Sequence, residues 1–200
     1  MKKAVLPPLT FPVDALEPYY DAKTVQLHHG KHHQAYVNGF NAALEKLEAV
    51  RAAGDFAAVK HWTRELAFHG GGHILHSLFW ANLKPGGGGE PHGDLATAIA
   101  SQFGSLQAFD TQLRAVTNAV EGSGWGIVAA GPGREVAILQ AEKHQNQLLP
   151  GWRPILAVDV WEHAYYLRYE NRRAEFVDVV LDHLVNWREV ERRFAEVAEV

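Results

Sequence analysis

The sequence predicts an α+β fold, in which an N-terminal helical hairpin lobe is followed by a mixed lobe of helices around a three-stranded antiparallel sheet. Three observations support this prediction. Apolar residues recur every three to four positions early in the chain, strand-like runs follow the turn at Gly122–Gly126, and the glycine-rich segment Lys84–Pro91 separates the two patterns. We therefore expect an N-terminal helical domain over residues 1–85 and a C-terminal α/β domain over residues 91–200.

The first lobe begins with an extended, proline-punctuated arm over residues 4–20. Asp21 is a typical N-cap residue and marks the start of a long amphipathic helix. The helices predicted in this lobe cover Asp21–Arg51, Phe56–Leu66 and Phe68–Leu83. Gly70–Gly72 interrupt the last of these, at a cost of up to ~1 kcal/mol each in a helix interior. Either the backbone turns there, or another segment packs closely on it.

The second lobe combines helical periodicity with a short sheet. Ser105 is the predicted N-cap of its second helix, and the Gly131-Pro132-Gly133 turn predicts a β-hairpin. The predicted helices cover Asp94–Phe103, Ser105–Val120, His163–Tyr169, Glu175–Val185 and Trp187–Val200. The predicted strands cover Trp125–Ala130, Glu135–Gln140 and Pro154–Val160.

Composition excludes several classes of function. The chain has 200 residues, a formal charge of −4 and no cysteine, so disulfides, thiolate metal sites and cysteine nucleophiles are excluded. Its basic residues are scattered, which argues against a nucleic-acid partner. No stretch approaches the ~20 apolar residues of a membrane span, and prolines interrupt the N-terminal region, where a secretion signal would need a continuous apolar run. We therefore expect a cytoplasmic protein.

Asp159 and His163 are set four residues apart at a predicted strand-to-helix junction. A carboxylate and a neutral imidazole at this spacing can project the same way and suit a first-row metal such as Fe, Mn, Zn or Cu. The pair alone is a weak signal, because such residues are more often a helix cap and a surface histidine.

Twelve histidines strengthen the metal hypothesis, and most of them gather in two N-terminal groups. In the first group, His28 and His32 share one helical face, while His29 and His33 share another with the same spacing. Periodicity does not choose between the two registers. The second group consists of His69, His73 and His76, a competing same-face triad that requires the glycines between them to stay helical.

From about Leu9 to its end, the sequence resembles the iron/manganese superoxide dismutase family. The similarity is carried by five motifs, ALEPYYDAKTVQLHHGKHHQAYVN, GGGHxxHSLFW, GSGWG, DVWEHAYYLRYENRR and VNW. The family places its metal on the first histidine of LHH, the second histidine of GGGHxxH, and the Asp and His of DVWEH. The resemblance therefore implies the metal ligands His28, His76, Asp159 and His163.

The resemblance also implies roles around the metal. Tyr36 and His32 would line the substrate channel, with Tyr36 helping proton delivery, and His144 would lie beside the metal-bound solvent. Three tryptophans, Trp80, Trp125 and Trp161, would wall the site. Glu162 and Tyr166 would reach across a two-fold interface to the partner subunit. Lys31 and Arg173 would supply positive potential that steers an anionic substrate.

The sequence departs from the usual family pattern at five positions, which are Gly72, His144, Leu75, His69 and Ile127. Most members place a glutamine beside the metal-bound solvent, whereas this chain has Gly72 at one candidate position and His144 at the other. A bulkier, titratable imidazole is expected to change the redox potential. Members with histidine there favour iron, which gives a weak preference for iron over manganese.

The function implied is superoxide dismutation, with one Fe or Mn ion per subunit cycling by one electron. The expected substrate is the superoxide anion, and the expected assembly is a homodimer or homotetramer. The alternative is a homodimer of the same fold that binds metal but is catalytically impaired by the changes at His144 and Leu75. A hydrolytic zinc site is disfavoured, since the chain lacks an HExxH motif.

Overall fold

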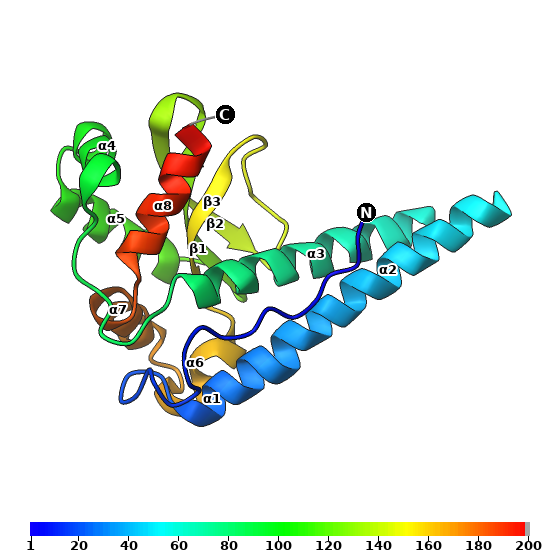
Figure 1. Ribbon diagram of the computed structural model, residues 1–200, viewed down its shortest axis with the longest axis horizontal. Helices are drawn as coiled ribbons and strands as arrows, with labels where there is room; N and C mark the ends of the chain where they lie inside the picture. The colour runs from blue at the N-terminus through cyan, green and yellow to red at the C-terminus, as the bar shows by residue number, and fades with distance from the viewer. Residues whose placement is uncertain (199–200) are drawn as a thin grey trace.

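The computed structural model describes residues 1–198 and confirms the predicted fold class. A helical hairpin forms the first lobe and projects away from a second lobe of helices around a small sheet (Figure 1). The helical elements of the first lobe are α1 (Ala22–Leu27), the π-helical segment η1 (His28–His33), α2 (Gln34–Ala53) and α3 (Val59–Ala81). Among the described residues, none of the helices combines the length and apolarity needed to cross a membrane.

The long first helix is confirmed, with one unpredicted feature. The carboxylate of Asp21 accepts a hydrogen bond from the backbone N–H of Thr24 at 2.9 Å, and the helical path ends before Gly54, whose φ is 65°. Between these ends, His28–His33 form a π-helical turn. Such turns are rare in proteins, and those that occur often lie at functional sites. The extra residue in the turn changes which side chains face a neighbouring element. Here the turn contains the whole first group of histidines.

The helices predicted at Phe56–Leu66 and Phe68–Leu83 form one helix, because α3 runs unbroken through Gly70–Gly72. Of the two alternatives for the glycines, the backbone does not turn there. Close packing explains the glycines. A Cβ atom on Gly70 would lie 3.1 Å from the ring of Phe40, and one on Gly72 would lie 2.6 Å from Tyr36. The missing side chains therefore allow α2 to approach α3 closely, at a cost in helix propensity.

The second lobe has the predicted order of helices and strands. Its elements are α4 (Gly93–Phe103), α5 (Leu106–Asn118), β1 (Gly124–Gly131), the 3₁₀ turn η2 (Pro132–Arg134), β2 (Glu135–Glu142), β3 (Arg153–Asp159), α6 (Glu162–Tyr169), α7 (Arg173–His183) and α8 (Trp187–Ala198). The sheet is antiparallel in the order β2-β1-β3, and Trp125 pairs with Asp159 at its end. Ser105 caps α5 as predicted. The last two residues of the helix predicted to end at Val200 lie outside the described residues.

Hydrogen bonds join the two lobes next to the glycine-rich segment. The buried Asn82, at the end of α3, donates its side-chain N–H to the carbonyl of Ile155 at 3.0 Å and accepts the backbone N–H of Ala157 at 3.1 Å. Further on, the N–H of Gly88 donates to the carbonyl of Val185 at 2.8 Å. The segment predicted as a linker is therefore packed against the second lobe, and α3 is held at a fixed position relative to β3.

Candidate metal centre

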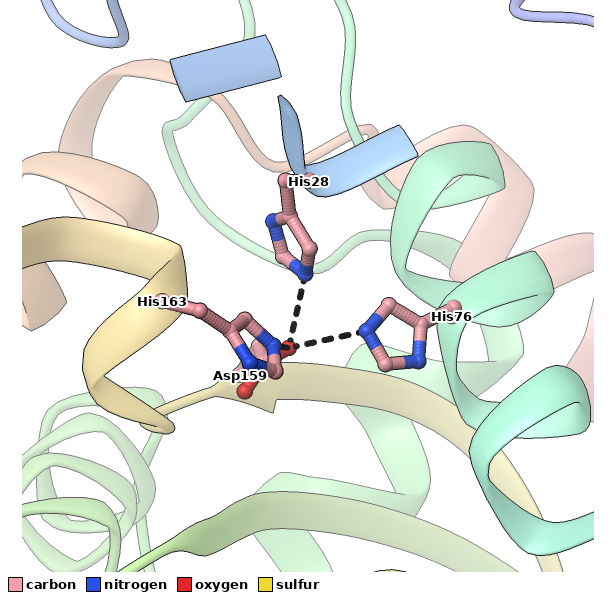
Figure 2. Close-up of side chains that lie close together, drawn as sticks. All are labelled: His28, His76, Asp159 and His163. Atoms are coloured by element: carbon pink, nitrogen blue, oxygen red, sulfur yellow. Dashed lines mark hydrogen bonds and ion pairs between the residues drawn. The ribbon is translucent and has the colours of Figure 1, made fainter. Parts of the chain in front are cut away.

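Four side chains from four elements converge between the lobes (Figure 2). His28 opens η1, His76 lies on α3, Asp159 is the last residue of β3, and His163 lies in the first turn of α6. One donor atom from each lies within 4.8 Å of every other. We call these four residues the candidate metal cluster. The structure thus brings together the ligand set that the resemblance implied.

One carboxylate oxygen is the meeting point of the cluster. Asp159 Oδ2 lies 3.0 Å from Nε2 of His28, 3.4 Å from Nε2 of His76 and 3.3 Å from Nε2 of His163. Its other oxygen, Oδ1, accepts the backbone N–H of Trp161 at 2.9 Å. This bond holds the carboxylate with Oδ2 turned toward the three imidazoles.

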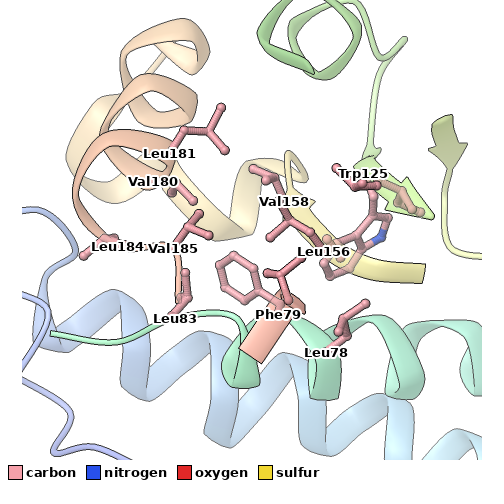
Figure 3. Close-up of a cluster of buried hydrophobic side chains, with 14 of the residues drawn as sticks. Leu78, Phe79, Leu83, Trp125, Leu156, Val158, Val180, Leu181, Leu184 and Val185 are labelled. Atoms are coloured by element: carbon pink, nitrogen blue, oxygen red, sulfur yellow. The ribbon is translucent and has the colours of Figure 1, made fainter. Parts of the chain in front are cut away.

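The apolar core beneath the cluster fixes the elements that carry it (Figure 3). Phe79 of α3, Trp125 of β1 and Val158 of β3 are fully buried there. Leu156 of β3 and Val180 of α7 pack into the same core. Such interiors are close-packed, so the elements they join have little freedom to shift. His76 and Asp159 are each within three residues of this core along their elements, and their side chains are held accordingly.

The protonation of His76 shows that the cluster fits a cation. Its Nδ1 lies 2.7 Å from the carbonyl oxygen of Gly72. A carbonyl only accepts, so Nδ1 must carry the proton, and Nε2 of the neutral ring is left with a lone pair. That lone pair faces Asp159 Oδ2 at 3.4 Å and has no hydrogen-bond partner among the described residues. Two electron-rich atoms facing each other in a buried site are stabilised by a positive ion between them.

His28 is oriented by a residue that sequence reasoning missed. The buried hydroxyl of Tyr20 lies 2.7 Å from Nδ1 of His28, which leaves Nε2 directed at Asp159. A hydrogen bond on the second ring nitrogen is the usual way in which a ligating imidazole is fixed. Tyr20 lies in the matched motif, but it precedes the helix cap at Asp21, where helical periodicity carries no information.

The electrostatics of the cluster favour a bound cation. Burial disfavours an ionised Asp159, but the neighbouring His163 and His28 outweigh this effect and hold its pKa below the usual range. Burial lowers the pKa of His28 to about 4, despite the opposing effect of Asp159, and lowers the pKa of His76 well below its ordinary value. At neutral pH the cluster therefore contains a carboxylate, and the imidazoles of His28 and His76 are uncharged, which are the forms that bind metals. Imidazole nitrogens and a carboxylate oxygen are donors that both iron and manganese accept.

The three predicted wall residues each lie beside a different imidazole of the cluster. The ring centroid of Trp80 is 4.9 Å from that of His28. Trp125 lies 5.0 Å from His76. Trp161 lies 5.4 Å from His163. This apolar enclosure limits the access of water and lowers the local dielectric constant.

Tyr36 and His144 pack against each other beside the cluster, with ring centroids 4.4 Å apart. The indole N–H of Trp125 donates to Nδ1 of His144 at 3.0 Å. Because this indole can only donate, Nδ1 has the lone pair and Nε2 carries the proton. Burial lowers the pKa of His144 to about 3, so the ring is a neutral donor at physiological pH and does not titrate there. Its buried Nε2 has no partner among the described residues.

Two of the predicted channel and steering residues lie near the surface at the first lobe. His32 is exposed on η1, and its ring stacks on that of His163 with centroids 4.4 Å apart. Lys31, beside it, is also exposed. Burial lowers the pKa of the partly covered His32. These positions agree with a channel that opens on this side.

Arg173 is engaged in structural hydrogen bonds. Its guanidinium donates to the carbonyl oxygens of Val120 at 2.7 Å and Gly122 at 2.6 Å, and to the hydroxyl of Tyr165 at 3.3 Å. Neutral acceptors leave its positive charge uncancelled, so a steering effect and a structural role are compatible.

The predicted interface residues, Glu162 and Tyr166, are exposed on α6. They lie on the same short helix as His163, one residue before it and three after it. The two side chains therefore lie on the surface close to the candidate metal cluster.

The competing triad of His69, His73 and His76 does not form, although the glycines stay helical. Only His76 points into the cluster. His69 Nε2 lies 3.4 Å from Glu65, and His73 Nδ1 lies 3.0 Å from Nε2 of the buried His33. The structure thereby selects one of the two registers in the first group, because His28 reaches Asp159 and His33 turns toward α3.

Comparison with known families agrees with this geometry. Residues 3–84 match the alpha-hairpin domain of iron/manganese superoxide dismutases, and residues 91–193 match the C-terminal domain of the same family.

Curated relatives cover almost the whole chain. A "Probable superoxide dismutase [Fe]" of Bacillus subtilis is 48% identical over 99% of this chain and 70% of that protein. A "Superoxide dismutase [Fe]" of Pyrobaculum aerophilum is 48% identical over 96% of this chain and 92% of its own length. A "Superoxide dismutase [Mn]" of Nocardia asteroides is 45% identical over 98% of this chain and 95% of its own length. Relatives of similar identity thus carry both metal names.

Proposed function

Because the chain belongs to the iron/manganese superoxide dismutase family, we propose that it disproportionates superoxide to dioxygen and hydrogen peroxide at the candidate metal cluster. The observation that carries this proposal is the convergence of three imidazoles on Asp159 Oδ2, with the lone pair of His76 held toward it. A bound Fe or Mn ion supplies one-electron redox chemistry, which oxidises one superoxide and reduces the next with the uptake of two protons.

The residues around the cluster support proton delivery. Burial raises the pKa of Tyr36, so its hydroxyl stays protonated at neutral pH and can donate. His144, held by Trp125 with the proton on Nε2, offers a second neutral donor on the same side. His32 lies toward solvent and can pass protons inward. Donors already in place lower the cost of adding charge and protons to a buried site.

The activity test is inhibition of cytochrome c reduction by enzymatically generated superoxide. We expect protein loaded with Fe or Mn to inhibit the reduction, and metal-free protein to leave it unchanged. Absence of inhibition by either loaded form would contradict the proposal. The impaired alternative has no support in the described residues, because the buried Leu75 and His144 are accommodated without displacing the four donors.

We further propose which metal the enzyme favours and how its subunits pair. The four ligands hold one ion per subunit, and His144 favours iron weakly. Subunits pair through α6, where Tyr166 and Leu167 are 51% and 57% exposed beside His163. Glu162→Ala is expected to weaken that dimer, as measured by sedimentation at low protein concentration. The predicted cytoplasmic location calls for cell fractionation.

A further inference from the structure

A positively charged hollow lies outside the candidate metal cluster, between the outer face of α3 and the segment that joins β2 to β3. The cavity has a volume of about 440 Å³, which is in the range of small-ligand sites. Arg64, Glu65 and His69 line it from α3, while Lys143 and Trp161 line it from the second lobe. None of the four cluster residues is part of its lining.

The charges of the hollow are unbalanced. Arg64 and Lys143 are both exposed, and neither forms an ion pair with an acidic side chain of the described residues. Glu65 is the acidic member of the lining, and its carboxylate is 3.4 Å from His69 Nε2. Two cationic side chains therefore face the cavity against one carboxylate, which favours an anionic ligand.

One residue of the lining, Trp161, also contacts residues at the candidate metal cluster. The indole of Trp161 stacks on His144 with ring centroids 4.5 Å apart and planes 6° apart. Its indole N–H donates to the backbone carbonyl of Lys143 at 3.1 Å. Trp161 also donates its backbone N–H to Asp159. A ligand held by Lys143 would thus lie next to Trp161, whose backbone N–H orients the carboxylate of Asp159.

We propose that this hollow between Arg64 and Lys143 binds a small oxyanion of the phosphate class. A guanidinium supplies paired N–H donors that match phosphate oxygens, and an ammonium adds a compact charge. The volume of the cavity accommodates inorganic phosphate and a small substituent on the phosphate. Because Trp161 is part of the lining, an aromatic substituent would have an aromatic side chain to pack against. Binding requires no metal, so the proposal stands or fails independently of dismutation.

The test is isothermal titration of the metal-loaded protein with inorganic phosphate and, separately, with phenyl phosphate. Arg64→Met and Lys143→Met should each weaken phosphate binding about threefold to tenfold, since each removes one charge-assisted contact. Glu65→Gln should strengthen it, because it removes the opposing carboxylate. The affinity should fall as salt is added. Tighter binding of phenyl phosphate would identify a phosphate ester as the ligand, and equal binding would identify the free anion.

Lys60→Met is the matched control, because Lys60 is exposed on α3 one turn before Arg64 and does not line the hollow. It removes the same charge and should leave phosphate affinity within about twofold of the parent protein. The proposal is overturned if phosphate does not bind, if all three cation variants weaken it equally, or if Arg64→Met and Lys143→Met leave it unchanged. The last result would show that the anion binds outside the hollow.

Discussion

Two groups of histidines occupy the same two helical segments but have different contacts. In the candidate metal cluster, His28 of η1 and His76 of α3 direct Nε2 at a carboxylate from the other lobe. Beside the cluster, Nε2 of His33 on η1 lies 3.0 Å from Nδ1 of His73 on α3. We call His33 and His73 the histidine pair.

The difference lies in what the second lobe contributes. Asp159 brings a negative charge to the cluster, and backbone or hydroxyl groups occupy the far nitrogens of His76 and His28. The pair has Ser77 beside it, with Oγ 3.4 Å from His33 Nε2, and one imidazole must donate to the other. The two ring nitrogens that face each other share one hydrogen bond, so neither offers a lone pair to a shared ion. A cluster of histidines therefore becomes a ligand set through its partners.

The largest expected effect comes from removing the carboxylate. Asp159→Ala should reduce the metal content of purified protein from nearly one ion per chain to a small fraction, because it deletes the sole charged donor. His73→Gln, in the histidine pair, is the control and should retain the metal. Elemental analysis measures both. An undiminished metal-to-protein ratio in Asp159→Ala would refute the ligand assignment.

The next effect concerns the close approach of α2 and α3. Gly72→Ala places a Cβ 2.6 Å from the ring of Tyr36, so the free energy of unfolding should fall by about 1–3 kcal/mol. Gly30→Ala is the control, because a Cβ there meets nothing within 4 Å and helix propensity favours alanine. Urea denaturation compares the two variants. Equal stability of both would show that the glycine at position 72 is not needed for packing.

The pH dependence of stability should report the histidine pair. Burial lowers the pKa of His33 to about 3, whereas an unfolded histidine titrates near ~6.5. The unfolded chain then binds a proton that the folded chain does not, so this contribution to stability is complete above ~6.5 and is lost as the pH falls toward 3. Unfolding of metal-free protein should become easier from pH 7.5 to 5, and His33→Gln should flatten the curve. An identical slope in the variant would mean that His33 is not buried in neutral form.

The smallest expected effect is a change of redox tuning. His144→Gln should shift the midpoint potential of the bound metal while leaving the metal content intact, because the side chain lies beside the cluster without belonging to it. Redox titration followed by optical spectroscopy measures the shift. If the potential stays the same, His144 does not interact with the metal-bound solvent.

Much of this fold followed from local patterns in the sequence. Helical periodicity and the cap at Asp21 predicted the hairpin, and glycine turns predicted the sheet. The unbroken α3 was not predictable, because the cost of Gly70–Gly72 is local whereas the packing of Phe40 and Tyr36 that offsets it is tertiary. The π-helical turn at His28–His33 escaped prediction for a similar reason, since an inserted residue leaves no mark in the composition.

The candidate metal cluster was likewise predictable in part from the sequence. The spacing of Asp159 and His163 indicated a metal, but the choice between His28 and His29 required the family resemblance. The carbonyl of Gly72 fixes the tautomer of His76, and the hydroxyl of Tyr20 orients His28. Both contacts depend on the folded geometry and had no signal in the sequence. His144 was expected to titrate, and only its burial beside Trp125 shows that it stays neutral.

The function proposed for this protein requires that the four converging donors hold one redox-active ion. Metal-free protein reconstituted separately with iron and with manganese, and assayed for bound metal and for superoxide dismutation, tests it most directly. We expect one ion per chain in each sample and dismutase activity in at least one. Protein that retains neither metal, or retains both without activity, would contradict it.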